Sequence, residues 1–148
     1  MARVNIRDSW RTVRAQFEDD DLDTVFRFRT ELPEKRIRSK YRNLIIFKWP
    51  YPAKKDGMPY AAVLKQMGSF EDQLEAAVES SQIGIQAVCL TGNGRRTWRY
   101  YVADKTEFLT ATKPLLRAFH PAVRVFRQKD DPNWELLAEI LPLLDCPH

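Results

Sequence analysis

The segment from residue 83 to residue 102 constrains the fold more than any other part of the chain. Two runs that are rich in apolar and β-branched residues, IGIQAVCL and RRTWRYYV, flank the four residues TGNG. An Asn-Gly pair between two such runs is the strongest short-range signal of a β-hairpin, because both residues tolerate the positive φ angles of a tight turn. The chain is therefore expected to contain at least one antiparallel pair of strands.

The alternation within RRTWRYYV assigns its side chains to two faces of a sheet. Trp98, Tyr100 and Val102 alternate with Thr97, Arg99 and Tyr101. Successive side chains of a strand point to opposite faces, so we expect the first set to be packed under helices. Arg99 and Tyr101 would then lie on an open face.

Four other segments have the pattern of strands. Residues 10–17, 24–30 and 122–128 alternate apolar and polar side chains, which is typical of half-buried strands. Residues 43–52 are apolar at nearly every position, as expected for a central strand that is covered on both faces. Together with the hairpin, these segments predict six strands.

The stretch after residue 58 has the apolar spacing of a helix. Leu64, Met67, Leu74 and Val78 lie near helical spacing, and Gly68 weakens the middle of the stretch. The letters SFED form a capping box, in which a serine is followed three residues later by an acid. A new helix could therefore start at Ser69.

Two more helices are predicted from their capping residues. Asp104 and Glu107 resemble a capping box, and Pro114 is expected to kink or interrupt the helix that follows. Asp131 caps a last helix that starts at Pro132, a residue favoured in the first turn. One face of this helix carries Trp134, Leu137, Ala138, Leu141 and Leu144.

The segment PEKRIRSKYR differs from its neighbours because it has no clear period. It carries five basic residues and no acid from Lys35 to Arg42. We interpret it as a solvated connection between a strand of the first hairpin and the central strand.

The order of these elements predicts an α+β fold in one domain, residues 1–148. Residues 43–128 read strand, helix, strand, strand, helix, strand, which is the split βαβ order (βαββαβ) of ferredoxin-like folds. Residues 10–30 add an N-terminal β-hairpin and residues 131–145 add a C-terminal helix. We expect the helices to lie on one face of a largely antiparallel sheet. The pattern leaves open whether the first hairpin extends this sheet or covers it.

The composition limits where the protein is expected to be located and what it is expected to bind. The chain has 24 Lys and Arg against 20 Asp and Glu, a net charge of +4, which is low for a dedicated nucleic-acid binder. The longest apolar run, Leu44 to Phe47, is too short to cross a bilayer, and the first ten residues lack a signal-peptide core. We therefore predict a cytoplasmic protein with no membrane partner, whose Cys89 and Cys146 are reduced thiols.

Residues for catalysis or metal binding are sparse. The only histidines are His120, which we expect at a helix end, and the terminal His148, so a nucleophile beside a base is not indicated. EDDDLD lacks the alternation of an EF-hand, and TGNG lacks the Lys and Ser or Thr of a phosphate loop. We predict no enzyme activity, no cofactor and no metal site. A carboxylate-based active site stays open, because paired acids need not be close in sequence.

The residues that could form a binding face come from several strands. An ordinary solvated face is the favoured interpretation, since RRTWRYYV contains a single outward aromatic and none of the glycines of RNA-recognition strands. The alternative is single-stranded nucleic-acid binding, with phosphate contacts from KRIRSKYR. The candidate face consists of Arg27, Arg29, Arg99, Tyr101 and Arg124.

Four short motifs resemble one known family. KWPYP, the DG.P turn, TGNGRRTWRYYVAD and KDDPNWELL occur in the order found in the bacterial domain of unknown function 695 family. The matched positions are Trp10, Tyr100, Tyr101, Asp104, Asp131, Pro132, Trp134 and Glu135. The resemblance implies no catalytic residue. It implies an association with the regulators of ribonuclease activity B, which are similar in fold and act by binding a ribonuclease.

The motifs and the lack of a catalytic constellation lead to one main expectation about function. It is a small protein-binding or regulatory domain without catalysis, whose partner is another protein. For Trp134, which could pack in the core or form an interface, we expect the core.

Overall fold

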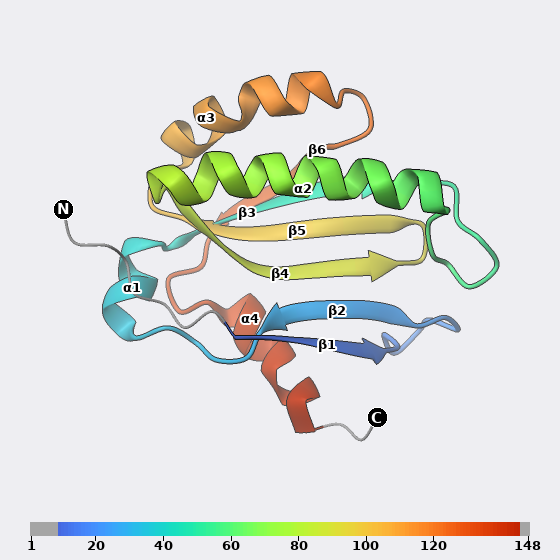
Figure 1. Ribbon diagram of the computed structural model, residues 1–148. Coiled ribbons are helices and arrows are strands. Elements are labelled where there is room, and N and C mark those ends of the chain that lie inside the picture. The colour runs from blue at the N-terminus through green and yellow to red at the C-terminus, as the bar shows by residue number, and fades with distance from the viewer. Residues whose placement is uncertain (1–8, 146–148) are drawn as a thin grey trace.

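The computed structural model describes residues 9–145, without the side chains of residues 79 and 80. Its strands form one six-stranded antiparallel sheet in the order β1-β2-β4-β5-β3-β6 (Figure 1). The predicted α+β class and the six predicted strands are confirmed for this part of the chain. The strands are β1 (Trp10–Ala15), β2 (Thr24–Arg29), β3 (Asn43–Pro50), β4 (Gly84–Gly92), β5 (Arg95–Val102) and β6 (Arg124–Asp130).

Both predicted hairpins form. Asn93 and Gly94 join β4 to β5 with φ angles of 52° and 82°, the conformation that the Asn-Gly pair favours. The first hairpin extends the sheet, because β2 pairs with β4 along its length and places Phe26 opposite Leu90. The N-terminal strands therefore add to the sheet and leave its central strands free to be covered by helices.

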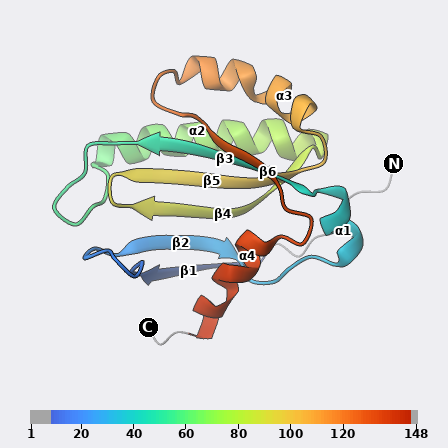
Figure 2. The same cartoon turned by 180° about the vertical axis from the view of Figure 1, so that it is seen from behind.

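Helices cover both faces of the sheet. The helices are α1 (Lys35–Lys40), α2 (Ala61–Ser81), α3 (Lys105–Ala118) and α4 (Glu135–Ile140), and a 3-10 turn, η1 (Leu141–Asp145), follows α4. Helices α2 and α3 lie on one face, and α4 lies on the other (Figures 1 and 2). The expectation that all helices share one face is wrong. The central strands are apolar on both sides, so each face needs a cover.

Helix α2 runs without a break through Gly68 and Ser69. The possible new start at Ser69 does not occur, and its Oγ instead accepts a hydrogen bond of 3.1 Å from Nε2 of Gln73. Met67 and Leu74 are fully buried on either side of this point. A glycine costs a helix about 1 kcal/mol, and burial of these side chains outweighs that cost.

The capping predictions hold for one helix and hold partly for another. Asp104 accepts a hydrogen bond of 2.9 Å from the backbone N–H of Glu107 and caps α3, as predicted. Asp131 also accepts bonds from the backbone, but α4 begins at Glu135 and not at Pro132. The N-cap is Trp134, whose φ of 53° turns the chain before the helix.

Helix α1 replaces the predicted solvated connection. From residue 34 to residue 42 only Ile37 and Tyr41, four positions apart, are buried, and the remaining residues are mostly charged. Two apolar residues at this spacing are too few to stand out from a loop by pattern. The helix forms because Tyr41 packs in the core and its OH donates a hydrogen bond of 2.9 Å to the carbonyl of Gln82.

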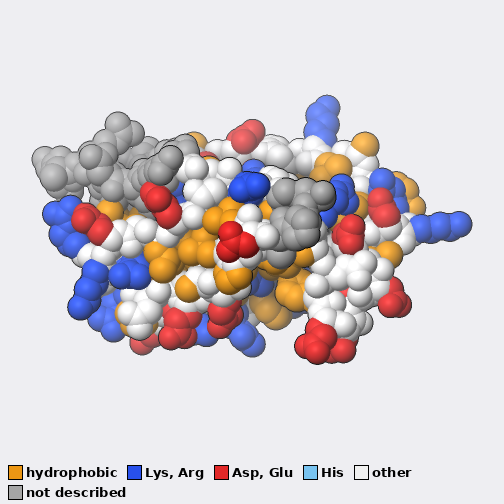
Figure 3. Space-filling model, turned by 90° about the horizontal axis from the view of Figure 1, so that it is seen from below, with side chains coloured by type: hydrophobic (Ala, Val, Ile, Leu, Met, Phe, Trp, Pro, Cys, Tyr) orange, Lys and Arg blue, Asp and Glu red, His pale blue; other side chains and the backbone are white. Residues whose placement is uncertain are grey.

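The sheet separates two apolar cores. Trp98, Tyr100 and Val102 are fully buried on the side of α2 and α3, as the alternation predicts. On the side of α4, Trp134 is also fully buried, which confirms the core interpretation, and it stacks on Tyr101 with 4.0 Å between ring centroids. Some hydrophobic side chains stay at the surface on the underside of the molecule, where β1 and α4 lie (Figure 3).

Candidate functional site

The structure divides the five predicted binding residues between the two faces of the sheet. Arg27 lies opposite Cys89, which lies opposite Trp98, so Arg27 shares the face of α2. Arg29, two positions further along β2, shares that face. The other three, Arg99, Tyr101 and Arg124, lie on the face of α4. They cannot form one surface with the first two.

Tyr101 is not on an open face, and the prediction that placed it there is wrong. It is fully buried under Trp134, and its OH donates a hydrogen bond of 2.7 Å to Oδ2 of Asp131. Burial, and then the bond to Asp131, raise the pKa of Tyr101 far above its ordinary value. The cause of the error is α4, which covers this face of the sheet, whereas all helices were expected on the other face.

Arg27 belongs to a cluster of polar side chains that form hydrogen bonds with one another. Its guanidinium donates to Oε1 of Glu71, and Nε1 of Trp98 donates to the same oxygen at 2.8 Å. Burial lowers the pKa of Arg27, but Cys89 and Glu71 raise it by more, so the net shift is upward. Arg27 therefore has a structural partner.

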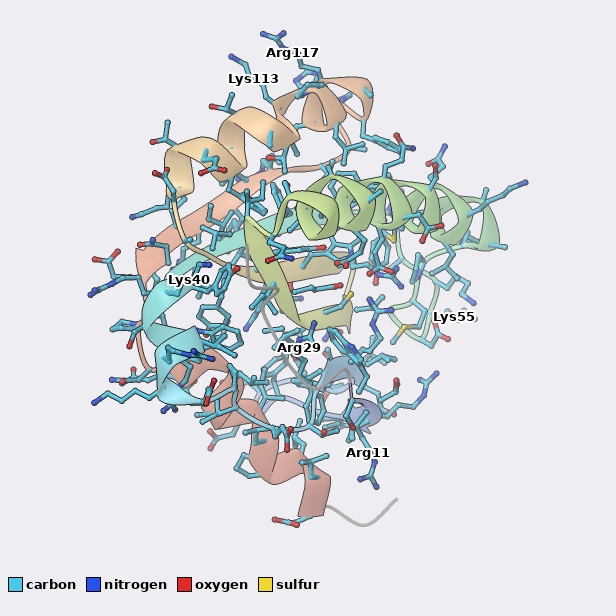
Figure 4. The ribbon with its side chains drawn as sticks, turned by 60° about the vertical axis from the view of Figure 1, so that its left-hand side comes forward. Arg11, Arg29, Lys40, Lys55, Lys113 and Arg117 are labelled. Carbon is cyan, nitrogen blue, oxygen red and sulfur yellow. The ribbon has the colours of Figure 1, made fainter. Side chains whose placement is uncertain are left out.

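Arg29 is also used inside the fold. Its Nε donates a hydrogen bond of 2.7 Å to the carbonyl of Gln86, and its guanidinium lies 4.7 Å from the ring centroid of Trp10. Figure 4 shows Arg29 lying against the sheet, whereas Lys113 and Arg117 project away from α3.

Arg124 lies on the edge strand β6, exposed to solvent. Its guanidinium lies 5.5 Å from the ring centroid of Phe126, and Nζ of Lys48 lies 4.4 Å from the same centroid. Phe126 is 44% exposed. This group stands apart from the other predicted residues and is a small basic surface around one aromatic ring.

A pocket of about 40 Å³ lies at the end of the sheet where β4 turns into β5. It is on the face of α4, but α4 crosses the sheet away from this turn (Figure 2). Its walls come from β2, β4, β5 and the loop after β1. We call it the anion pocket, and it is lined by Phe17, Thr24, Leu90, Gly92, Arg95, Thr97 and Arg99.

Buried polar atoms without partners gather at the anion pocket. Within the described residues, four buried side-chain polar atoms make no hydrogen bond, and three of them belong to Thr24, Thr97 and Arg99. The two threonines are only 3% and 6% exposed. A buried polar group without a partner costs about 1–3 kcal/mol, so such groups are rare and call for an explanation. Three such atoms belong to residues that line one pocket, which makes this pocket the candidate binding site.

Gly92 keeps the threonine side of the pocket in place. A Cβ atom at this position would lie 3.0 Å from the carbonyl oxygen of Asp23 and 3.0 Å from Cα of Thr24. Those atoms are backbone and cannot move without displacing the start of β2. The close approach of β4 to β2 therefore requires glycine, and it sets Thr24 beside the pocket.

Positive charge at the anion pocket has no carboxylate to balance it. Burial lowers the pKa of Arg99; the neighbouring Tyr101 raises it, and Arg95 and Arg127 lower it further. Within residues 9–145, Arg99 forms no ion pair with an acid. Arginine stays protonated in proteins. The pocket therefore combines a fixed cation with two hydroxyl groups, a set that suits a carboxylate or phosphate oxygen.

Sequence reasoning found Arg99 but missed the rest of the pocket. Thr97 could have been included, because it alternates onto the same face as Arg99. Thr24 could not, because β4 lies between its strand and β5, and only the pairing of all three strands brings it near. Cys89 is buried and free, as predicted, whereas Cys146 and His148 lie outside the described residues.

The described part of the chain offers no other obvious chemical centre. Within it, no group of three or more His, Cys, Asp or Glu side chains is placed to hold a metal ion. Among the helices that the structure describes, none combines the length and the apolar character needed to cross a membrane.

Comparisons with known proteins identify the family. A model of the family of unknown function DUF695 matches residues 8–141. No match was found among curated proteins or among solved structures. The family match covers most of the chain, including every residue of the anion pocket. The chain therefore belongs to the DUF695 family.

Proposed function

We propose that this domain is a non-catalytic, cytoplasmic binding module that holds an anionic group of a partner protein in the anion pocket. The observation that carries the proposal is the convergence of three unpartnered buried polar atoms, those of Thr24, Thr97 and Arg99, on one pocket. An anion at Arg99 would accept hydrogen bonds from its guanidinium, and the hydroxyl groups of Thr24 and Thr97 line the same pocket.

The chemistry of the pocket favours binding over catalysis. Its polar side chains are donors or hydroxyl groups, and none of its lining residues is a histidine, cysteine or carboxylate that could act as a general base. Charge-assisted bonds to a guanidinium are roughly twice as strong as neutral ones. A carboxylate or phosphate oxygen would therefore be held firmly without being transformed.

The arrangement of strands in residues 43–128 also supports a protein partner, because it suggests a distant relationship to a family that binds proteins. We propose that residues 43–128 form a ferredoxin-like split βαβ unit, because β5 lies between β4 and β3 and because β3 lies between β5 and β6. The sequence motifs suggest a relationship of this unit to the regulators of ribonuclease activity B, which bind a protein. A partner protein for this domain agrees with that relationship.

Thermal unfolding in the presence of small anions tests the proposal. Chloride is replaced by acetate or by phosphate at constant ionic strength, and we expect the Tm of the protein to rise and then saturate, because a ligand that binds only the folded state stabilises it. The variant Arg99→Gln should lose this rise. The control Arg124→Gln removes one positive charge from the same face and should keep it. Equal rises in all three proteins would contradict the proposal, since general salt effects act on all of them.

A second candidate function is the binding of single-stranded nucleic acid at the edge of the sheet. The observation that favours it is the exposed ring of Phe126, which lies between Lys48 and Arg124. One stacked base contributes about 1–3 kcal/mol, and phosphate contacts weaken steeply with salt. Fluorescence anisotropy with a labelled oligonucleotide should therefore show binding that falls about tenfold in Phe126→Ala. An affinity that Phe126→Ala leaves unchanged would rule this candidate out.

A further inference from the structure

An apolar groove opens directly beside the anion pocket. The groove has a volume of about 440 Å³ and lies between the end of β1 and the segment formed by α4 and η1. It shares Phe17, Leu90 and Arg99 with the anion pocket, so the two lie side by side, and we refer to them together as the depression. A ligand held at Arg99 would extend into this groove.

The inside of the groove is suited to an apolar side chain. Its lining includes Ala15, Phe26, Leu136, Ile140 and Leu143, which come from β1, β2, α4 and η1. The underside of the molecule accordingly shows hydrophobic side chains at its centre, with charged side chains around them (Figure 3). An apolar surface of this kind, rimmed by charge, is typical of a binding site.

The rim of the groove carries negative charge. Glu18 and Glu139 both line it, and both are exposed. Within the described residues neither glutamate forms an ion pair. The depression therefore has positive charge at its closed end and negative charge at its rim, with apolar walls between them.

We infer that this depression binds the C-terminal end of a peptide of a partner protein. The terminal carboxylate lies in the anion pocket at Arg99, the last side chain is apolar and fills the groove, and a Lys or Arg upstream pairs with Glu18 or Glu139. The inference rests on the proposed function and adds the class of ligand. A fatty acid would satisfy the pocket and the groove but would leave the two rim carboxylates without use, so the charge pattern favours a peptide.

Affinity selection from a peptide library tests the inference. The library consists of N-acetylated hexapeptides with a free carboxylate, randomised at the last four residues, and the bound peptides are identified by mass spectrometry. We expect Leu, Ile, Phe or Met at the last position and Lys or Arg further upstream. The best peptide should bind about tenfold or more weakly as its carboxamide, and similarly in Arg99→Gln, because each change removes one partner of a charged hydrogen bond.

A charge reversal at the rim is a second test that does not disturb the fold. Glu139 is exposed, so Glu139→Lys should leave the protein folded and should shift the upstream preference from Lys and Arg to Asp and Glu. An unchanged upstream preference would overturn the assignment of the rim. Decanoate that binds as tightly as the best peptide would overturn the choice of a peptide.

The failure of this inference can be distinguished from the failure of the proposed function. If no peptide is enriched while acetate still raises the Tm in a way that depends on Arg99, the peptide assignment is wrong and the anion pocket stands. If neither peptides nor small anions bind, both are wrong. Equal binding of the carboxylate and carboxamide forms would also overturn the peptide assignment, because the terminal charge would then have no role.

Discussion

Arg27 and Arg99 lie on opposite faces of the same sheet and have opposite surroundings. Arg27 pairs with Glu71, and that carboxylate also accepts a hydrogen bond from Trp98. Arg99 has no acid partner among the described residues, and its Nε atom is buried without a hydrogen bond. The pKa of Arg27 is raised and that of Arg99 is lowered. The first arginine has an acid partner within the fold, and the second has none among the described residues.

The difference separates two roles of a partly buried charge. A buried ion pair that is broken by removing one partner destabilises a protein, because the remaining charge is left uncompensated. On the α2 side the chain provides both partners. At the pocket on the α4 side the described residues provide Arg95, Arg99 and two hydroxyl groups but no acid, and we propose that a bound anion completes this set.

The largest expected effect is the loss of anion binding in Arg99→Gln. Removing one partner of a desolvated charged pair costs about 2–5 kcal/mol of binding free energy, so acetate or phosphate should no longer bind measurably. Isothermal titration calorimetry checks the affinity. The matched variant Arg27→Gln should keep the affinity and lose folding stability instead. The comparison between the two arginines breaks if both variants change the same property.

Removing Glu71 should be the largest change in stability. In Glu71→Ala the buried N–H of Trp98 and the guanidinium of Arg27 lose their acceptor, and the unfolding free energy should fall by about 2 kcal/mol. The neighbouring Asp72 is exposed and serves as the control, since Asp72→Ala should leave stability nearly unchanged. Urea denaturation measures both. Equal urea midpoints for the two variants would show that the cluster does not contribute to folding stability.

Tyr101→Phe should destabilise the protein by about 1 kcal/mol, because it removes the hydrogen bond to Asp131 and keeps the stacked ring. The exposed Tyr60 provides the control Tyr60→Phe, which should have no effect. Ligand affinity should be unchanged in both variants, since Tyr101 is not part of the pocket lining. A large loss of affinity in Tyr101→Phe would place this residue in the binding site after all.

The same tyrosine makes stability depend on pH at the alkaline end. Burial and Asp131 raise the pKa of Tyr101, whereas the unfolded tyrosine loses its proton near pH 10. The folded state therefore holds the proton longer, and the contribution to stability is full below about pH 10 and is lost as the pH rises above it, by about 1.4 kcal/mol per pH unit. Denaturation between pH 9 and pH 11 should show a shallower decline in Tyr101→Phe. Parallel curves for the two proteins would contradict the assignment.

The smallest expected effect is a gain in stability. Thr97→Val keeps the shape of the side chain and removes a buried hydroxyl without a partner, so the unfolding free energy should rise by up to about 1 kcal/mol while anion affinity falls. Thr112 is also buried, but its hydroxyl donates to the carbonyl of Phe108, so Thr112→Val should show no such gain. Thermal unfolding distinguishes the two. A loss of stability in Thr97→Val would mean that its hydroxyl already has a partner.

The local features of the fold could be predicted from the sequence, and the long-range ones could not. The turn at Asn93 and the cap at Asp104 follow from residues a few positions apart. The burial of Tyr101 depends on α4, whose apolar face gives no sign of which side of the sheet it will cover. Thr24 enters the anion pocket only because three strands pair in a particular register. A sequence pattern shows which residues share a face of a strand or helix. It does not show which other element packs against that face.

The most direct test of the account is the NMR signal of the Arg99 side chain. Its Nε–H group is buried without a partner, whereas Arg27 is already bound to Glu71 and provides the internal reference. During titration with acetate, observed in 1H–15N spectra, we predict that the Nε–H peak of Arg99 shifts downfield and saturates while that of Arg27 stays in place. A peak of Arg99 that does not move, or arginine peaks that all drift together without saturation, would contradict the claim that this pocket binds an anion.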